Sequence, residues 1–281
     1  MGFNLGDIIV DRVQYGYAET IETASKPSEL LYTLTQLQDV SINITADSTD
    51  AVDNQGTLIK RFWKSKSGEL SANNAMVNLN IIAAAAGEGS VTSADGEELT
   101  MPKIITAKQN ADGTLEYTLC KPEHADQIIA ETIKVNDFTN NGTSGKSYKK
   151  ATGTDGDATE AEFVYSNGKI KLPKVANGLF IIKYERKITK DQGARIINRG
   201  DKFPSTVKLT LKALVVDPCE VDTLRAAYIV IPSFQVSPEL EISMTSDGQL
   251  PYNGVLQMSY CSEDKALYEI YYADDDENEE D

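Results

Sequence analysis

The sequence predicts a mainly β fold, an antiparallel β-sandwich or barrel with one or two short flanking helices and long loops. Most apolar runs alternate with polar residues at a period of two, which is typical of half-buried strands. Asn-Gly and Asp-Gly strings separate neighbouring runs and indicate hairpins. The 281 residues are 41% hydrophobic and 25% charged, a globular composition. A chain of this length buries about three quarters of its unfolded surface, so it needs no disulfide or metal to fold.

Strands are expected first along the chain. Val40, Ile42 and Ile44 alternate with polar residues, as in a strand with one buried face. Residues 27–39 fit either a helix or a strand, because Leu residues recur at helical spacing. The Leu-Tyr-Thr-Leu-Thr string at 31–35 has high β-propensity, so we favour a strand.

Two short helices are expected. In the first, Ser71 is a suitable N-cap and Gly87 a suitable stop. The apolar residues at helical spacing between them are Met76, Leu79, Ala83 and Ala86. The second helix is predicted to start at Pro122 and to cover residues 125–131.

Hairpins and further strands fill the rest of the chain. Residues 104–119 and 163–172 each contain a glycine turn, at 110–113 and 166–168, and glycine tolerates the positive φ of a tight turn. The alternating strands are 205–215, with lysines on its outer face, 239–244 and 256–260. Leu179–Tyr184 and Tyr228–Ile231, the latter stopped by Pro232, are apolar on both faces. Each is either a central strand or a strand covered by another subunit.

The domain prediction is a single β-sandwich over residues 1–273 with a polar loop insertion at about 137–161. Residues 274–281 carry seven carboxylates in eight positions and are predicted to be a disordered acidic tail. The formal net charge is −16 and becomes −9 without those seven charges. The tail could serve a lumen, keep free subunits apart or solubilise the protein, and we favour the second role.

The charge restricts the partners. A pI near 4.6 argues against a protein that grips DNA or an anionic membrane surface, because such proteins cluster Lys and Arg on one face. It does not argue against a protein that lets DNA pass without binding it. No apolar run approaches the roughly 20 residues that cross a bilayer.

The sequence has few groups for catalysis. His124 is the only histidine, and it lies in a polar stretch without a positioned nucleophile. The cysteines are Cys120, Cys219 and Cys261. They form no C-x-x-C pair, so we expect no metal site. Their odd number, in a sequence that does not begin with a secretory signal, indicates reduced thiols in a cytoplasmic compartment. Residues 145–147 lack the first glycine of a P-loop, and residues 155–160 lack the glycine of a calcium loop. We therefore expect no enzyme activity, metal or cofactor.

Two oppositely charged segments are candidate subunit contacts. The first is the acidic loop 47–56, and the second is a basic hairpin tip between Glu185 and Lys202. The candidate residues are Asp47, Asp50, Asp53, Arg186, Lys187, Lys190, Arg195, Arg199 and Lys202. Opposite charge predicts that the segments meet across subunits, although a solvated basic loop is an equal alternative.

The order of several segments resembles bacteriophage tail tube (major tail) proteins. These segments are Asp39–Thr45, Gly56–Lys64, Ser65–Leu70, the small-residue run 74–87, Ile229–Pro232, Pro238–Ile242, the turn Asp247–Gly248 and Cys261–Tyr268. The resemblance covers roughly residues 30–90 and 205–272.

The resemblance implies a virion structural protein. Subunits of such tubes form rings of six whose inner strands join into one barrel, and the rings stack into a conduit for DNA ejection. The implied partners are other copies and other tail proteins, with DNA passing unbound and no membrane. The implied location is the virion tail, after synthesis in the host cytoplasm. The alternatives are a capsid-decorating, head–tail connector or adhesion β-sandwich of a virion, and a carbohydrate-active enzyme. We interpret Trp63 as a packing residue, which disfavours the enzyme.

Overall fold

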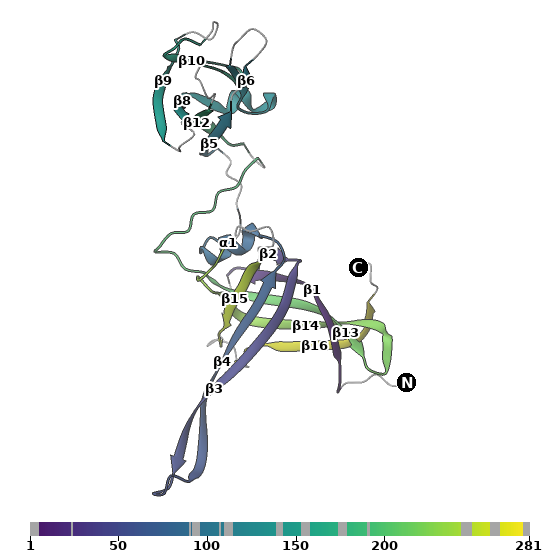
Figure 1. The fold of residues 1–281 in the computed structure, drawn as a ribbon. Helices are drawn as coiled ribbons and strands as arrows, with labels where there is room; N and C mark the ends of the chain where they lie inside the picture. Colours follow the sequence, from purple (N-terminus) through teal and green to yellow (C-terminus); the bar gives the residue numbers. More distant parts are fainter. Residues whose placement is uncertain are drawn as a thin grey trace. The chain divides into compact units, whose positions relative to one another are not determined.

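The structure is a computed structural model that describes residues 6–23, 25–89, 91, 96–106, 108–109, 115–138, 143–152, 158–173, 179–189, 192–242, 249–258 and 265–277. It divides into two compact units: unit 1 combines Met1–Thr92 with Ile196–Asp281, and unit 2 is Ser93–Arg195. Strands dominate both units, so the predicted mainly β fold is confirmed (Figure 1). The sequence predicts one domain over 1–273, whereas the structure has two units. The chain divides into these two units because each unit has its own buried core.

Unit 1 is one antiparallel sheet of eight strands. The strands are β1 (Ile9–Thr20), β2 (Leu30–Leu34), β3 (Leu37–Val52), β4 (Leu58–Asn74), β13 (Thr206–Asp217), β14 (Glu220–Val236), β15 (Leu250–Leu256) and β16 (Glu269–Glu277). Their order is β2-β1-β13-β14-β15-β4-β3, and β16 pairs with β14. The strands predicted within 27–39, at 40–44 and at 205–215 are confirmed.

The long strand β14 organises this sheet. One edge of β14 pairs with β13 along most of its length. The other edge is shared, because its first part pairs with β16 and its last part, Phe234–Val236, pairs with β15. Tyr228–Ile231 is thus a central strand, one of the two predicted options. Pro232 does not end it as predicted: it lies at a register shift between Ile231 and Phe234, a position that tolerates a residue without an N–H donor.

The predicted lysine-bearing outer face of β13 is covered at its centre. Thr210 and Lys212 are both buried, although they alternate with the apolar residues as predicted. The Lys212 ammonium lies 5.5 Å from the centre of the Tyr15 ring, so it keeps a favourable contact there. The exposed-face prediction is wrong at this point, where Tyr15 of the neighbouring strand β1 lies beside Lys212.

The core of unit 1 joins distant strands of the sheet. Tyr32 of β2 and Tyr252 of β15 pack edge to face with ring centres 6.4 Å apart, and the Phe234 ring lies 5.6 Å from that of Tyr252. In the strand order β2 and β15 are separated by β1, β13 and β14. The sheet therefore curls so that β2 and β15 enclose one core, as in a sandwich or partial barrel.

The first helix is shorter than predicted. α1 (Leu79–Ala85) is capped by Asn78, whose side chain accepts from the Asn80 amide at 2.9 Å. Ser71, the predicted cap, lies in β4 and pairs with β3 and β15 instead. Sheet pairing on both edges overrides the local helix signal there. The chain leaves the helix at Gly87, with φ at 80°, as predicted.

Unit 2 is a second sheet of eight strands. Its elements are β5 (Glu98–Thr106), β6 (Lys108–Gln109), β7 (Leu115–Thr118), the 3-10 helix η1 (Pro122–Gln127), β8 (Ile128–Phe138), β9 (Ser144–Lys150), β10 (Glu162–Ser166), β11 (Lys169–Leu172) and β12 (Leu179–Lys187). The order is β5-β12-β8-β9-β10-β11-β7-β6, with β9 and β10 parallel and the other pairs antiparallel. The predicted second helix is present but ends at Gln127, because Ile128 already begins β8.

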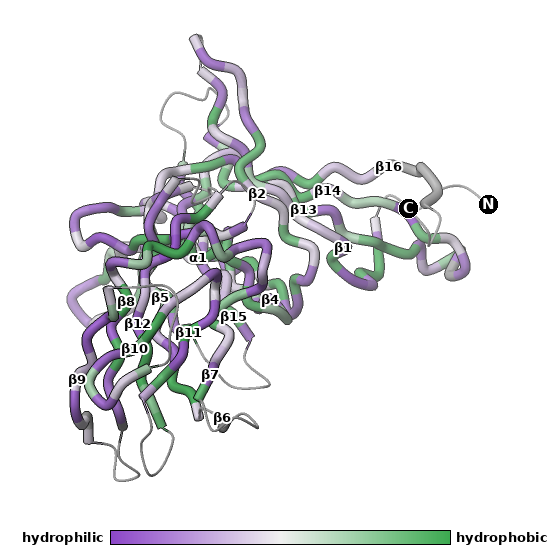
Figure 2. The backbone as a smooth tube through the Cα atoms, turned by 90° about the horizontal axis from the view of Figure 1, so that it is seen from above, coloured by the Kyte–Doolittle hydropathy of each residue, from purple (hydrophilic) through white to green (hydrophobic). Residues whose placement is uncertain are grey.

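Both predicted hairpins lie in unit 2. β10 and β11 are joined by Asn167 and Gly168, which have φ values of 44° and 78°, a tight turn of the predicted kind. β6 pairs with β7, while their turn at 110–113 lies outside the described residues. Leu179–Tyr184 opens β12, a central strand between β5 and β8, which again selects one of the two predicted options. Figure 2 shows apolar (green) and polar (purple) stretches in turn along the strands.

The predicted polar loop at 137–161 is not one long loop. Within it, β9 pairs with β8 through Tyr148 and with β10 through Lys149 and Lys150. The Tyr148 ring packs against Phe180 at 6.2 Å, so one aromatic residue anchors an otherwise polar strand. The loop prediction failed because backbone pairing needs no apolar pattern.

The C-terminal predictions are partly corrected. Residues 240–242 are described and form no strand, and residues 243–248 lie outside the described residues. β15 ends at Leu256, so the strand predicted at 256–260 does not begin there; 259–260 lie outside the described residues. Residues 274–277 of the predicted disordered tail belong to β16, where Asp276 pairs with Arg225 and Glu277 with Leu224. Residues 278–281 lie outside the described residues.

Candidate subunit-contact site

A long β3–β4 hairpin extends beyond the rest of the unit 1 sheet (Figure 1). β4 pairs with β15 only from Gly68 to Asn74, whereas β3 and β4 continue to pair from Thr45–Ser67 out to Val52–Leu58. We call residues 45–67 the arm. Among the described residues its strands pair only with each other, so the arm is a two-stranded ribbon.

The arm exposes large apolar side chains. Trp63, Phe62 and Ile59 are 65%, 51% and 69% exposed, and Val52 and Leu58 are exposed as well. Side chains alternate across a strand, so Phe62 lies on one face of the ribbon and Trp63 on the other. Trp63 is therefore no packing residue within the chain, contrary to the sequence interpretation. Apolar clusters of this kind mark contact surfaces.

The acidic candidates hold the arm together. Arg61 donates from Nε to Asp50 Oδ1 at 2.7 Å and from Nη2 to Oδ2 at 2.9 Å. The bidentate hydrogen bond from Arg61 lowers the pKa of Asp50. Asp47 lies exposed on β3 nearby. The predicted acidic loop 47–56 is thus mostly a strand, and Asp50 already has a partner across it.

The arm ends in a tight turn built on Asp53. Its carboxylate accepts hydrogen bonds from the amides of Thr57 at 2.7 Å and Gln55 at 2.9 Å. These backbone donors, with Thr57 first, lower the pKa of Asp53. Gly56 has φ at 84°, which a glycine adopts without strain. Asp53 therefore shapes the tip of the arm.

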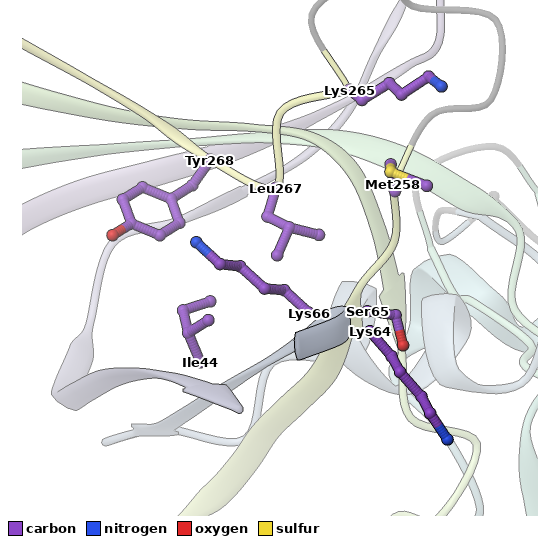
Figure 3. A pocket seen from close by; sticks show the side chains of 8 residues that line it. All are labelled: Ile44, Lys64, Ser65, Lys66, Met258, Lys265, Leu267 and Tyr268. Atoms are coloured by element: carbon purple, nitrogen blue, oxygen red, sulfur yellow. The ribbon is translucent and has the colours of Figure 1, made fainter. Parts of the chain in front are cut away.

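A pocket lies at the base of the arm. It has a volume of about 700 Å³ and is lined by Ile44, Lys64, Ser65, Lys66, Met258, Lys265, Leu267 and Tyr268. Figure 3 shows Lys66 extending past Ile44 toward Tyr268, whereas Lys64 and Lys265 extend outward. We call it the lysine pocket. We call its apolar lining residues the floor: Ile44, Met258, Leu267 and Tyr268. This floor and the three ammonium groups suit a ligand that carries both apolar and anionic groups.

The lysine pocket belongs to a basic island in an acidic unit. Unit 2 contains fifteen acidic and fifteen basic residues, so the net charge of −16 resides in unit 1. Unit 1 has twelve basic residues. Five of them lie on the arm or at its base and make up the basic island: Lys60, Arg61, Lys64, Lys66 and Lys265. Lys64, Lys66 and Lys265 form no ion pair with any other described residue.

The basic candidates at 186–202 form no hairpin among the described residues. Arg186 and Lys187 end β12, and the Arg186 guanidinium donates to Gln127 and Gln192. Arg195 donates to Glu97 at 2.8 Å. Arg199 and Lys202 are exposed, and Lys190 lies outside the described residues. Their pairing with the acidic arm across subunits stays a prediction.

Among the residues that the structure describes, no group of three or more His, Cys, Asp or Glu side chains is arranged to hold a metal ion. None of the described helices has the length and apolar character of a membrane span.

Comparison with known proteins identifies the family. The model of the YomU/Tube protein family matches residues 20–265, which include the arm, all of unit 2 and every residue of the lysine pocket except Leu267 and Tyr268. The chain belongs to the YomU/Tube protein family. The predicted resemblance to phage tail tube proteins is thereby confirmed, and with it an assignment to the virion tail. No curated protein matches the chain.

For a tail tube protein, the arm is the feature that the sequence analysis missed. The parts of β3 and β4 that form the arm have no buried face, so their sequence shows no alternation of apolar and polar residues that would predict strands. Adjacent aromatic residues flanked by cations, Arg61-Phe62-Trp63-Lys64, were the available sign, because such a string has no place in a polar loop.

Proposed function

We propose that this protein is a tail tube subunit that polymerises as stacked hexameric rings and forms the conduit for DNA ejection. The arm is the observation that carries the proposal. A two-stranded ribbon is marginally stable alone in water, and this one exposes apolar side chains on both faces. Neighbouring protein on each face would stabilise the ribbon and bury its apolar side chains. Repeated copies in a ring and in the next ring would supply it.

Open sheet edges support the same proposal. Within the described residues, β2 pairs only with β1, β3 only with β4, and β16 only with β14. Open edges invite pairing with another chain, and closure into a continuous barrel removes them. Ring formation would therefore satisfy backbone groups that the subunit leaves at its edges.

The charge distribution supports a DNA conduit. Unit 1 carries the whole net charge of −16, so a wall built from it repels phosphates. Rows of cations along the wall would release counterions and hold the duplex. In this proposal unit 1 lines the DNA path, the protein is not an enzyme, and it needs no cofactor. Its partners are other copies and other tail proteins.

Electron microscopy of the purified protein tests the proposal directly. We expect tubes or six-fold rings, and immunogold label along the tails of virions. Monomers at high concentration together with label on capsids would contradict it and favour the decorating or connector alternative. A gel-shift assay at moderate salt should show no DNA binding, and tight binding would refute the conduit.

A further inference from the structure

We propose that the lysine pocket of one subunit binds the acidic segment Asp274–Asp281 of a second copy. The inference rests on the proposed self-assembly and names the contact that joins two copies. The pocket combines Lys64, Lys66 and Lys265 with an apolar floor, and all three lysines lack an ion-pair partner among the described residues. Ammonium groups beside a partly apolar surface bind carboxylates more strongly than fully solvated ones do.

Charge complementarity selects the occupant. The basic island is the densest group of cations in unit 1, where acidic residues outnumber basic ones by sixteen. The densest run of carboxylates in the chain is Asp274–Asp281, with seven in eight positions.

The segment cannot reach the pocket of its own subunit while β16 is formed. β16 begins at Glu269, beside the pocket residue Tyr268, and runs away along β14 to Glu277. Its nine residues place the end of the strand roughly 27 Å from its start. Residues 278–281 span at most about 14 Å when fully extended. The carboxylates beyond β16 therefore do not reach the lysine pocket of their own subunit.

The inference reverses the role expected from the sequence. If the acidic segments only repel one another, neutralising them should speed polymerisation at low salt. If each segment binds a lysine pocket, neutralising it should slow polymerisation at low salt. The sign of the effect separates the two hypotheses.

Carbodiimide cross-linking tests the contact, because the reagent joins an ammonium to a carboxylate without a spacer. Assemblies grown from an equal mixture of 14N- and 15N-labelled full-length protein should give mixed-isotope peptides. We expect these to link residues 274–281 to Lys64, Lys66 or Lys265. Links within one copy, links from these lysines to Glu263 or Asp264, or links from the segment to other lysines would each overturn the inference.

Charge variants give a second readout. The substitutions Lys64→Glu, Lys66→Glu and Lys265→Glu together should raise the critical concentration at low salt on the order of tenfold or more. The control substitutions Lys121→Glu, Lys134→Glu and Lys149→Glu change the charge equally in unit 2 and should have a smaller effect. Glu279→Gln, Glu280→Gln and Asp281→Asn leave β16 unchanged and should weaken assembly without affecting folding, as monitored by circular dichroism.

A charge swap completes the test. Combining the three pocket substitutions with Glu279→Lys, Glu280→Lys and Asp281→Lys should restore much of the lost assembly. Tubes that form equally well with all these variants would overturn the inference but leave the proposed function intact. If the unmodified protein forms no oligomer in the microscope, the proposed function fails, and the contact between copies fails with it.

Discussion

The hydroxyl groups of Tyr32 and Tyr252 lie 2.9 Å apart in the buried core of unit 1 and share a hydrogen bond. Either oxygen can donate, so the pair satisfies two polar atoms that would otherwise be buried without a partner. Because β2 and β15 are not neighbours in the sheet, this bond ties β2, at one end of the sheet, to the more distant strand β15. We expect this hydrogen bond to fix the position of β2 relative to β15 across the core.

A double-mutant cycle measures the strength of this tie. Tyr32→Phe or Tyr252→Phe alone should lower the free energy of unfolding by about 1–2 kcal/mol, because each leaves one buried hydroxyl unpaired. The double variant should cost less than the sum of the two single variants. Urea unfolding at low protein concentration gives the three values. Strictly additive costs would contradict a coupled pair.

High pH should weaken unit 1 through the same pair. Burial raises the pKa of Tyr32 to about 12 and raises that of Tyr252 as well. Both groups thus hold their protons more tightly in the folded than in the unfolded chain. Their contribution to stability is complete below pH 10, the ordinary tyrosine value, and falls as the pH rises through the folded-state pKa values.

The measurement is a comparison of urea midpoints between pH 9 and pH 11.5. The unmodified protein should lose more stability over this range than the Tyr32→Phe/Tyr252→Phe variant, which keeps all other tyrosines. Equal losses would show that the two phenols do not cause the alkaline destabilisation.

The close approach of β15 to Phe234 predicts a local packing defect. A Cβ atom at Gly254 would lie 2.4 Å from the Phe234 ring and 2.5 Å from the Gln235 carbonyl oxygen. Gly254→Ala should therefore lower the free energy of unfolding by about 1–3 kcal/mol. Gly200→Ala is the control, because nothing lies within 4 Å of its added Cβ. Chemical denaturation compares the two, and equal stability of both variants would contradict the packing argument.

The sequence predicts the elements whose signals are local. The alternation in β13 and the Asn167–Gly168 turn need only neighbouring residues, and both are correct. The start of α1 and the polar strand β9 depend on partners distant in the chain, so local patterns fail there. The candidate site shows the same limit. The sequence places Asp50 and Asp53 in an acidic loop, whereas the structure has Asp50 in a paired strand and Asp53 in the turn that ends the ribbon.

Removing the aromatic side chains of the arm should impair assembly. Phe62→Ser and Trp63→Ser together leave the sheet core intact, because both side chains are exposed. Each removes a large apolar surface from a subunit contact, so the critical concentration should rise by tenfold or more, as roughly expected for hot-spot aromatic residues. Ile104→Ser, an equally exposed apolar residue in unit 2, is the control. Light scattering gives the critical concentration, and unchanged assembly would exclude the arm as a contact.

Reversing the charge of Arg195 and Arg199 tests the predicted pairing with the acidic arm. Arg195→Glu and Arg199→Glu should weaken assembly, because two attractive contacts per subunit become repulsive. Exposed ion pairs contribute about 0.2–1 kcal/mol each, so the critical concentration should rise on the order of tenfold at low salt. The defect should shrink as salt screens the charges.

One internal contact must be separated from this effect. Arg195 already pairs with Glu97 inside unit 2, so its reversal also places two carboxylates together. Glu97→Gln removes that pair while keeping the basic charge, and it should assemble normally. Arg199, which is exposed, gives the cleaner single test. If Arg199→Glu assembles like the unmodified protein at low salt while Arg195→Glu only loses stability, Arg195 acts within its own unit and the pairing across subunits is refuted.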